Sequence, residues 1–179
     1  MLSIPTELDA VDYSVQRVYV NGMMKLIARL FQAESEVDAE IKREVSALPE
    51  GFIFRMEAMP GTPCFILQHR DGLMRVLPDD SPLKPHLVIR FKHLTHAYLV
   101  LAFQEGTATS YANDRIIIDG DPALAMKVVR CLNRLQTVVL PRLIAERAVK
   151  TYPDLKLTEK LQLSAKTYGK LVLNLLKEI

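Results

Sequence analysis

The stretch 113–133, NDRIIIDGDPALAMKVVRCLN, joins a run of isoleucines to a helical pattern through Gly120-Asp121-Pro122. The isoleucines predict a short strand at 115–118, because β-branched residues fit a pleated sheet. Asp121 can accept hydrogen bonds from the free N–H groups of a helix start, and Pro122 loses no bond at the first helical position. Gly120 permits backbone angles that other residues resist. The corner is therefore predicted to be a strand-to-helix joint.

An ion or phosphate site at the same corner is disfavoured. A calcium loop of the EF-hand type needs oxygen ligands at alternate positions and a closing glutamate, whereas Asp121 is followed by Pro-Ala-Leu-Ala-Met. Phosphate-binding loops need several glycines, and Gly120 stands alone in this stretch. We expect the apolar residues after the joint to face inward on a helix: Ala123, Leu124, Met126, Val128, Val129 and Leu132.

The composition is that of a globular domain with a substantial core. The 179 residues are 49% hydrophobic and 25% charged, as in ordinary soluble proteins, and folding at this length buries roughly 70% of the chain's surface. Cys64 and Cys131 lie in apolar sequence, which does not resemble a disulfide framework. The longest apolar run, 97–103, is far shorter than the ~20 residues of a membrane span. With no secretory signal pattern at the N-terminus, we expect a cytoplasmic protein.

The remaining chain predicts an α+β order of elements. Ser35 and Asp38 form a capping pattern before a second helix, Gly106 is expected to end an apolar helix, and 107–113 is interpreted as a linking segment. Strands are expected at 51–58, 64–69, 73–77, 86–91 and 115–118, and helices at 12–32, 35–47, 93–104, from Pro122, at 137–150 and at 155–178.

The joint and its surroundings resemble the sterol carrier protein type 2 family (SCP2, a sterol- and lipid-binding domain). Tyr111-Ala112, the strand 115–118, Gly120-Asp121 and Leu124-Ala125-Lys127 follow the order of that family's signature. The resemblance covers about residues 50–135. It implies a five-stranded, mostly antiparallel sheet covered by helices, with an apolar tunnel for a fatty acyl chain, a sterol or a related lipid.

The resemblance also implies a division of the chain. Residues 1–50 form an N-terminal helical extension, 51–150 the lipid-binding domain and 151–179 a C-terminal amphipathic helix. A fourteen-carbon chain offers about 11 kcal/mol on burial before ordering costs, at roughly 0.8 kcal/mol per methylene, so micromolar binding requires no polar contact. The side chains expected to line the tunnel, each of which can equally be close-packed core, are Phe52, Phe54, Phe65, Leu67, Ile89, Phe91, Leu99, Leu101, Phe103, Met126 and Leu140.

The C-terminal helix is predicted to be basic and amphipathic. Residues 140–179 contain eight Lys/Arg and four Asp/Glu, whereas 1–50 contain five and nine. Such a helix can pack within the chain, cap the tunnel, form a homodimer contact or touch an anionic membrane peripherally. Its apolar stripe consists of Leu157, Leu161, Ala165, Tyr168, Val172, Leu175 and Ile179, with Leu163, Leu171 and Leu176 beside it.

The sequence gives little support for an enzyme or for a nucleic-acid-binding protein. His93 and His96 would share a helix face, but a zinc site needs a third ligand. Neither Cys64 nor Cys131 lies in an activating position, and no G-x-S-x-G elbow occurs. Basic residues are interleaved with acids, and the chain has no tryptophan, which disfavours nucleic-acid binding.

We therefore expect a non-enzymatic protein for lipid binding and lipid transport, without catalytic residues, cofactor or metal. Its partner would be a fatty acyl lipid, a sterol-like molecule or a quinone-like isoprenoid. The alternative is a protein–protein interaction module with a vestigial cavity, or an accessory factor, for example in quinone synthesis. Bound lipid favours the carrier, whereas a filled core with a concentration-dependent dimer favours the module.

Overall fold

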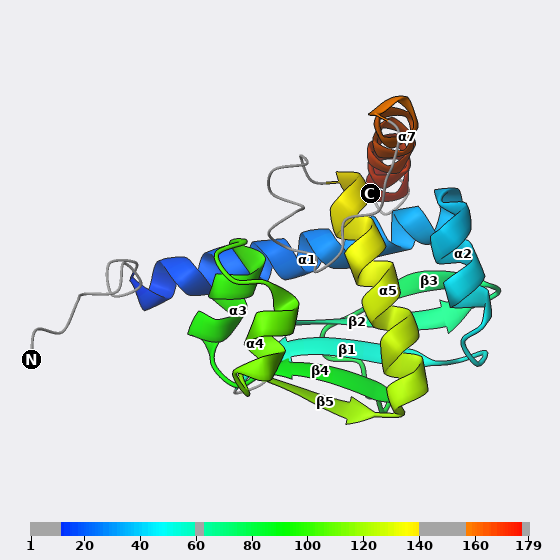
Figure 1. Cartoon of the computed structure of the whole chain (residues 1–179). Helices are drawn as coiled ribbons and strands as arrows, with labels where there is room; N and C mark the ends of the chain where they lie inside the picture. Colours follow the sequence, from blue (N-terminus) through cyan, green and yellow to red (C-terminus); the bar gives the residue numbers. More distant parts are fainter. Residues whose placement is uncertain (1–11, 60–62, 140–156, 177–179) are drawn as a thin grey trace, which may run out of the picture.

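The computed structural model describes residues 12–59, 63–139 and 157–176. Five strands form one sheet in the order β3-β2-β1-β4-β5 (Figure 1). β1 and β4 run parallel, and the other neighbouring strands pair antiparallel. This confirms the expected α+β class with a mostly antiparallel sheet. The strands are β1 (Ile53–Ala58), β2 (Cys64–Arg70), β3 (Leu73–Leu77), β4 (Leu87–Phe91) and β5 (Ile116–Gly120).

The helices α1, α3, α4 and α5 lie over one face of this sheet, and α7 packs on α1 (Figure 1). The long helix α1 contacts β2 and β3 and extends past the sheet at its N-terminal end. In the described ranges, no helix is long and apolar enough to cross a membrane. The helices are α1 (Tyr13–Val37), α2 (Ala39–Ser46), α3 (Leu94–Leu101), α4 (Thr107–Ala112), α5 (Pro122–Val139) and α7 (Leu157–Leu176).

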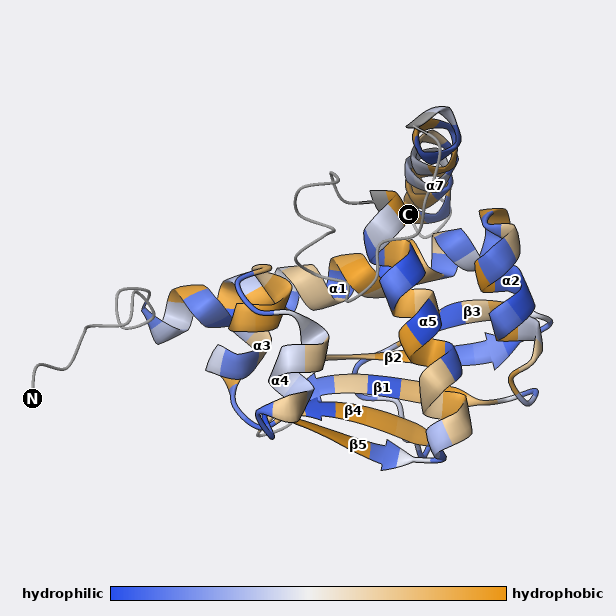
Figure 2. Ribbon diagram, viewed as in Figure 1, coloured by the Kyte–Doolittle hydropathy of each residue, from blue (hydrophilic) through white to orange (hydrophobic). Residues whose placement is uncertain are grey.

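The main core lies between the helices and one face of the sheet, and hydrophobic residues run along most of β4 and β5 (Figure 2). Phe54 of β1 lies opposite Leu67 of β2 and Leu87 of β4, and all three are fully buried. The rings of Phe54 and Phe65 meet edge to face with centroids 5.7 Å apart. α1 contributes Met24 to the same cluster. Every second residue of the central strands therefore faces this core.

The opposite face of the sheet is covered by the chain itself. β3 is an edge strand and β4 lies beyond β1, so the connection 78–86 has to cross β2 and β1. The Cys64 thiol lies 3.9 Å from the Asp79 carbonyl oxygen, which places this connection on the face away from the helices. Ile53 and Ile66 are consequently buried on that face as well.

The joint after β5 has the structure that the sequence predicts. Asp121 Oδ1 accepts hydrogen bonds from the backbone N–H of Ala123 at 2.7 Å and of Leu124 at 3.2 Å. Gly120 has φ +140°, and a Cβ there would lie 2.6 Å from the carbonyl oxygen of His86. Glycine is therefore required both by the backbone angle and by the close approach of β4.

The predicted cap of the second helix is wrong by three residues. Ser35 lies inside α1, where its hydroxyl donates to the carbonyl of Gln32 and accepts from the backbone N–H of Met74 in β3. This buried contact with the sheet replaces a capping role. Asp38 caps α2 instead, because its Oδ1 accepts from the N–H groups of the first turn.

Two further local predictions differ from the structure. The segment after Gly106, interpreted as a link, forms the short helix α4, in which Ser110 is buried. On α5, Ala123 and Met126 point to solvent, with Met126 54% exposed. The buried side of this helix is formed instead by Ala125, Val128, Cys131 and Leu135. The predicted helix at 137–150 falls mostly outside the described residues, and α5 itself ends at Val139.

Candidate functional site

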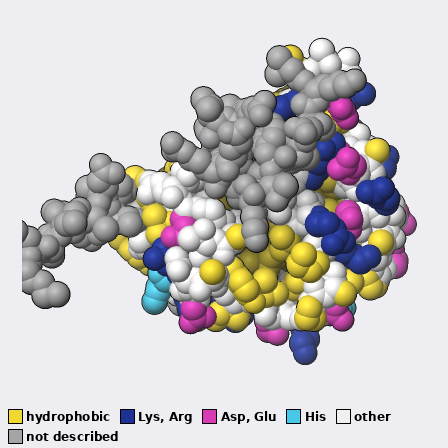
Figure 3. All heavy atoms as spheres, viewed as in Figure 1, with side chains coloured by type: hydrophobic (Ala, Val, Ile, Leu, Met, Phe, Trp, Pro, Cys, Tyr) yellow, Lys and Arg dark blue, Asp and Glu magenta, His cyan; other side chains and the backbone are white. Residues whose placement is uncertain are grey.

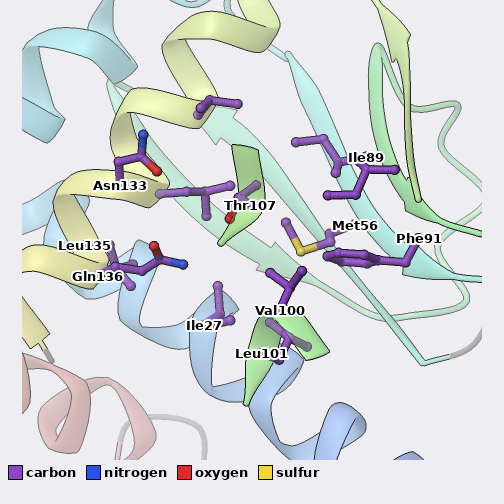
Figure 4. A pocket seen from close by; sticks show the side chains of 13 residues that line it. Ile27, Met56, Ile89, Phe91, Val100, Leu101, Thr107, Asn133, Leu135 and Gln136 are labelled. Carbon is purple, nitrogen blue, oxygen red and sulfur yellow. The ribbon is translucent and has the colours of Figure 1, made fainter. Parts of the chain in front are cut away.

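A small cavity of about 50 Å³ lies between the sheet and the helices that cover it. Its floor is formed by β1, β4 and β5, and its walls by α1, α3, α4 and α5 (Figure 4). Seven elements from different parts of the sequence thus meet around one space. The lining residues are Ile27, Met56, Ile89, Phe91, Val100, Leu101, Thr107, Ile116, Val129, Leu132, Asn133, Leu135 and Gln136.

Most side chains that line the cavity are apolar, and the few polar ones are uncharged. Thr107, Asn133 and Gln136 are polar, and the ten other lining residues are hydrophobic. Asn133 and Gln136 extend from α5, across the cavity from Met56 and the sheet (Figure 4). The Gln136 Oε1 atom is buried and has no hydrogen-bond partner in the part of the chain that the structure describes. No charged side chain occurs among the described residues that line the cavity.

The more exposed part of the cavity lining includes residues of both α4 and α5. The lining residues of the sheet, such as Ile89 and Phe91, are buried, whereas Thr107, Val129 and Leu132 on the two helices are half-buried. Hydrophobic side chains gather at the surface over the gap between these helices (Figure 3). An apolar molecule would therefore meet hydrophobic surface before it reaches the cavity.

Three of the predicted tunnel residues line this cavity: Ile89, Phe91 and Leu101. Lipid contact by these side chains stays a prediction. Met126 is exposed, Phe103 is half-buried at φ +58° just after α3, and Leu140 lies outside the described residues. The remaining predicted residues are buried and do not line the cavity: Phe52, Phe54, Phe65, Leu67 and Leu99.

The polar lining residues were not predicted from the sequence. Asn133 and Gln136 stand one turn apart, and Asn133 directly follows the apolar residue Leu132 on α5. Two amides beside the apolar side of an amphipathic helix are a usable signal, because buried amides need hydrogen-bond partners. Thr107 carried no signal, since it opens a helix that the sequence did not predict.

The candidate nucleophiles and metal ligands do not form a reactive site in the described residues. Burial raises the pKa of the Cys131 thiol to about 12 and also raises the pKa of the Cys64 thiol, so both stay protonated. The rings of His93 and His96 meet edge to face with centroids 5.1 Å apart. No three His, Cys, Asp or Glu side chains in the described ranges come together as a metal site would need.

A buried polar junction lies where α7 docks on α1. Glu34 of α1 is fully buried and accepts a hydrogen bond from Thr167 Oγ1 of α7 at 3.0 Å. Burial raises the pKa of the Glu34 carboxyl to about 8. Beside it, Glu36 accepts from Lys170 Nζ at 2.6 Å and from Asn174 Nδ2 at 3.2 Å. The docked side of α7 is therefore largely polar.

The apolar stripe of α7 faces outward. Leu161 is 61% exposed, and Tyr168, Val172 and Leu175 are also among the exposed hydrophobic residues. At about 100° per residue, these four positions lie roughly 80–140° around the helix from Thr167, on a different side. α7 packs within the chain, as one of the four alternatives expected, but not through its apolar stripe.

Comparison with known proteins gives similarity to solved structures only. No family model matches the chain, and a search of curated proteins finds no match. The UbiJ-SCP2 ubiquinone synthesis protein is 13% identical, with a TM-score of 0.44 over 66% of this chain and 96% of that chain. The sterol carrier protein domain 2 of Helicoverpa armigera is 15% identical, with a TM-score of 0.46 over 62% and 85%.

A third similar structure is the sterol carrier protein 2 like 2 from Aedes aegypti, 15% identical, with a TM-score of 0.33 over 55% of this chain and 94% of that chain. All three contain domains of the SCP2 type, the family that the sequence resembles. What the cavity of this chain can bind is decided by its own lining residues.

Proposed function

We propose that this protein binds a lipid at the cavity between the sheet and α1, α3, α4 and α5, and acts as a non-enzymatic carrier in the cytoplasm. The observation that supports this most is the lining, in which ten of thirteen side chains are hydrophobic. Burial of hydrocarbon against such a surface contributes roughly 0.8 kcal/mol per methylene. The ligand classes that fit are a fatty acyl lipid, a sterol-like molecule and a quinone-like isoprenoid.

Binding requires the cavity to widen. A space of about 50 Å³ holds water but not a hydrocarbon chain. The short helix α4 is the element that can give way, because Ser110 is its one buried residue, and elements with few buried apolar contacts open at low free energy. We propose that the lipid enters between α4 and α5 and lies over β4 and β5.

Narrowing the site tests this proposal. Leu101→Trp places an indole ring at the buried part of the cavity, and Val129→Trp places one at its half-buried rim. Both variants are expected to lose uptake of a neutral fluorescent lipid analogue by tenfold or more, while circular dichroism shows the native fold. Leu161→Trp, on the exposed stripe of α7, is the matched control and should bind like wild type. Wild-type uptake by both folded cavity variants contradicts the proposed site.

The exposed stripe of α7 favours one alternative function, an interaction module that pairs with itself or a partner protein. Leu161 and Val172 are more than half exposed, and such an unpaired apolar helix face often marks an interface. Light scattering over a hundredfold concentration range tests for self-association. A dimer that Val172→Asp dissolves, together with no lipid uptake, would support the module over the carrier.

A further inference from the structure

Three of the thirteen side chains that line the cavity are polar, and all three lie on α4 or α5. Asn133 and Gln136 of α5 and Thr107 of α4 are the polar lining residues. The Gln136 Oε1 atom is buried and lacks a hydrogen-bond partner across the described ranges. A buried acceptor without a partner is costly, and native structures usually satisfy it. A ligand group that donates a hydrogen bond therefore fits this position.

The cations of α5 are turned away from the cavity. Lys127 Nζ lies 3.3 Å from the carbonyl oxygen of Ala47, at the end of α2. Arg130 pairs with Glu44 of α2 at 2.8 Å. Because both partners belong to α2 or its end, these two cations face the side of α5 opposite the lining residues.

The third cation of the helix is held in the same way. Arg134 Nε lies 3.0 Å from the carboxylate of Asp38, which caps α2, and the Arg134 side chain is 10% exposed. Among the described residues, a ligand carboxylate beside Asn133, Gln136 and Thr107 would therefore meet amides and a hydroxyl but no positive charge. Burying a carboxylate without a cation is far more costly than burying a hydroxyl that is hydrogen-bonded.

We propose that the cavity takes an uncharged lipid with a hydroxyl head group, such as a long-chain or polycyclic alcohol, whose O–H donates to Gln136 Oε1. Asn133 and Thr107 supply the remaining polar contacts around the hydroxyl oxygen. This inference rests on the proposed lipid-binding function and narrows its ligand class. A fatty acid anion and a lipid that cannot donate a hydrogen bond are the classes that it excludes as preferred ligands.

Three ligands of equal chain length test the inference: tetradecan-1-ol, 1-methoxytetradecane and tetradecanoate. Each is measured at pH 7.5 by displacement of the neutral fluorophore N-phenyl-1-naphthylamine. The alcohol is expected to bind about tenfold more tightly than the ether and the carboxylate, since a buried hydrogen bond or an unpaired buried charge separates them. The comparison in the wild-type protein requires no variant.

Gln136→Met keeps the length of the side chain and removes its acceptor. This variant is expected to bind the alcohol about tenfold more weakly than wild type and the ether equally well. Gln104→Met, at an exposed position after α3, is the matched control and should leave all three affinities unchanged. The conservative variant Gln136→Asn, which keeps an amide, is expected to recover part of the preference for the alcohol.

The outcomes distinguish failure of the head-group inference from failure of the proposed lipid-binding function. Equal binding of alcohol and ether, or tightest binding of tetradecanoate, overturns the head-group inference and leaves lipid binding intact. A preference for the alcohol that Gln136→Met does not change overturns the role of Gln136. Failure of the fluorophore and all three ligands to bind overturns the proposed function and the inference together.

Discussion

Replacing Glu34 by glutamine should remove a pH-dependent loss of stability. Glu34 is 0% exposed at the junction of α1 and α7. Burial, the largest cause, raises its pKa to about 8, and the hydrogen bond from Thr167 acts in the opposite direction. Asp38 raises the pKa further, whereas Arg134 lowers it. The ordinary pKa of a glutamate, which applies to the unfolded chain, is 4.5.

The sign follows from proton uptake. Between about pH 4.5 and pH 8 the native carboxyl holds a proton that the unfolded chain has released, so the free energy of unfolding falls as pH rises. The stability that the neutral Glu34 carboxyl contributes is fully present below about pH 4 and is lost as the pH rises to about 8. The two pKa values, 4.5 and about 8, differ by about 3.5. At about 1.4 kcal/mol per pH unit, ionising Glu34 costs on the order of 5 kcal/mol.

Glu34→Gln tests this with little change in shape. The glutamine is uncharged at every pH and keeps an oxygen that can accept from Thr167 Oγ1. Urea unfolding measured from pH 5 to pH 9 should show wild type losing several kcal/mol relative to the variant. Glu159→Gln, at an exposed position of α7, is the control and should follow wild type. Parallel pH profiles for wild type and Glu34→Gln would refute the reasoning.

Three other changes have defined outcomes. Gly120→Ala should destabilise the protein by more than about 1 kcal/mol in urea unfolding, because its Cβ would lie 2.6 Å from the His86 carbonyl oxygen and the residue has φ +140°. Gly22→Ala has open space around it and should stabilise α1 by about 0.5–1 kcal/mol. Equal effects of the two substitutions on stability would contradict this. Asp121→Ala should cost about 1 kcal/mol and Asp121→Asn much less, since the oxygen that caps α5 is lost only in the first. Cys131 should resist iodoacetamide at pH 7.5 until the protein unfolds, because burial raises its pKa to about 12, and rapid labelling of the native protein would contradict that burial.

Local patterns predicted the sheet well. The five strands lie within two residues of their predicted positions, because alternation of large apolar side chains is strong in β1 and β4. The joint at Gly120 was also predictable, since its cap and its glycine act on neighbouring atoms. Ser35 shows where such reasoning ends. Its partner is the backbone N–H of Met74, 39 residues away in sequence, and no local pattern contains that contact.

The cavity and the orientation of α7 were less predictable for a related reason. Periodicity predicts which side of an element is buried but not where the covering helices leave a gap. Phe54 and Ile89 share the inward face of the sheet, yet only Ile89 lines the cavity. For α7, the apolar stripe left the packed side open, and the contacts of Thr167 and Lys170 with buried or half-buried acids of α1 fix a different side of the helix.

The lipid-carrier proposal is tested most directly by native mass spectrometry of the purified protein, followed by solvent extraction and identification of the lipid. The predicted result is one lipid per chain, uncharged and carrying a hydroxyl group, which is absent from the Leu101→Trp variant. A protein that purifies empty and also fails to take up alcohol, ether, fatty acid and quinone analogues would contradict the proposal.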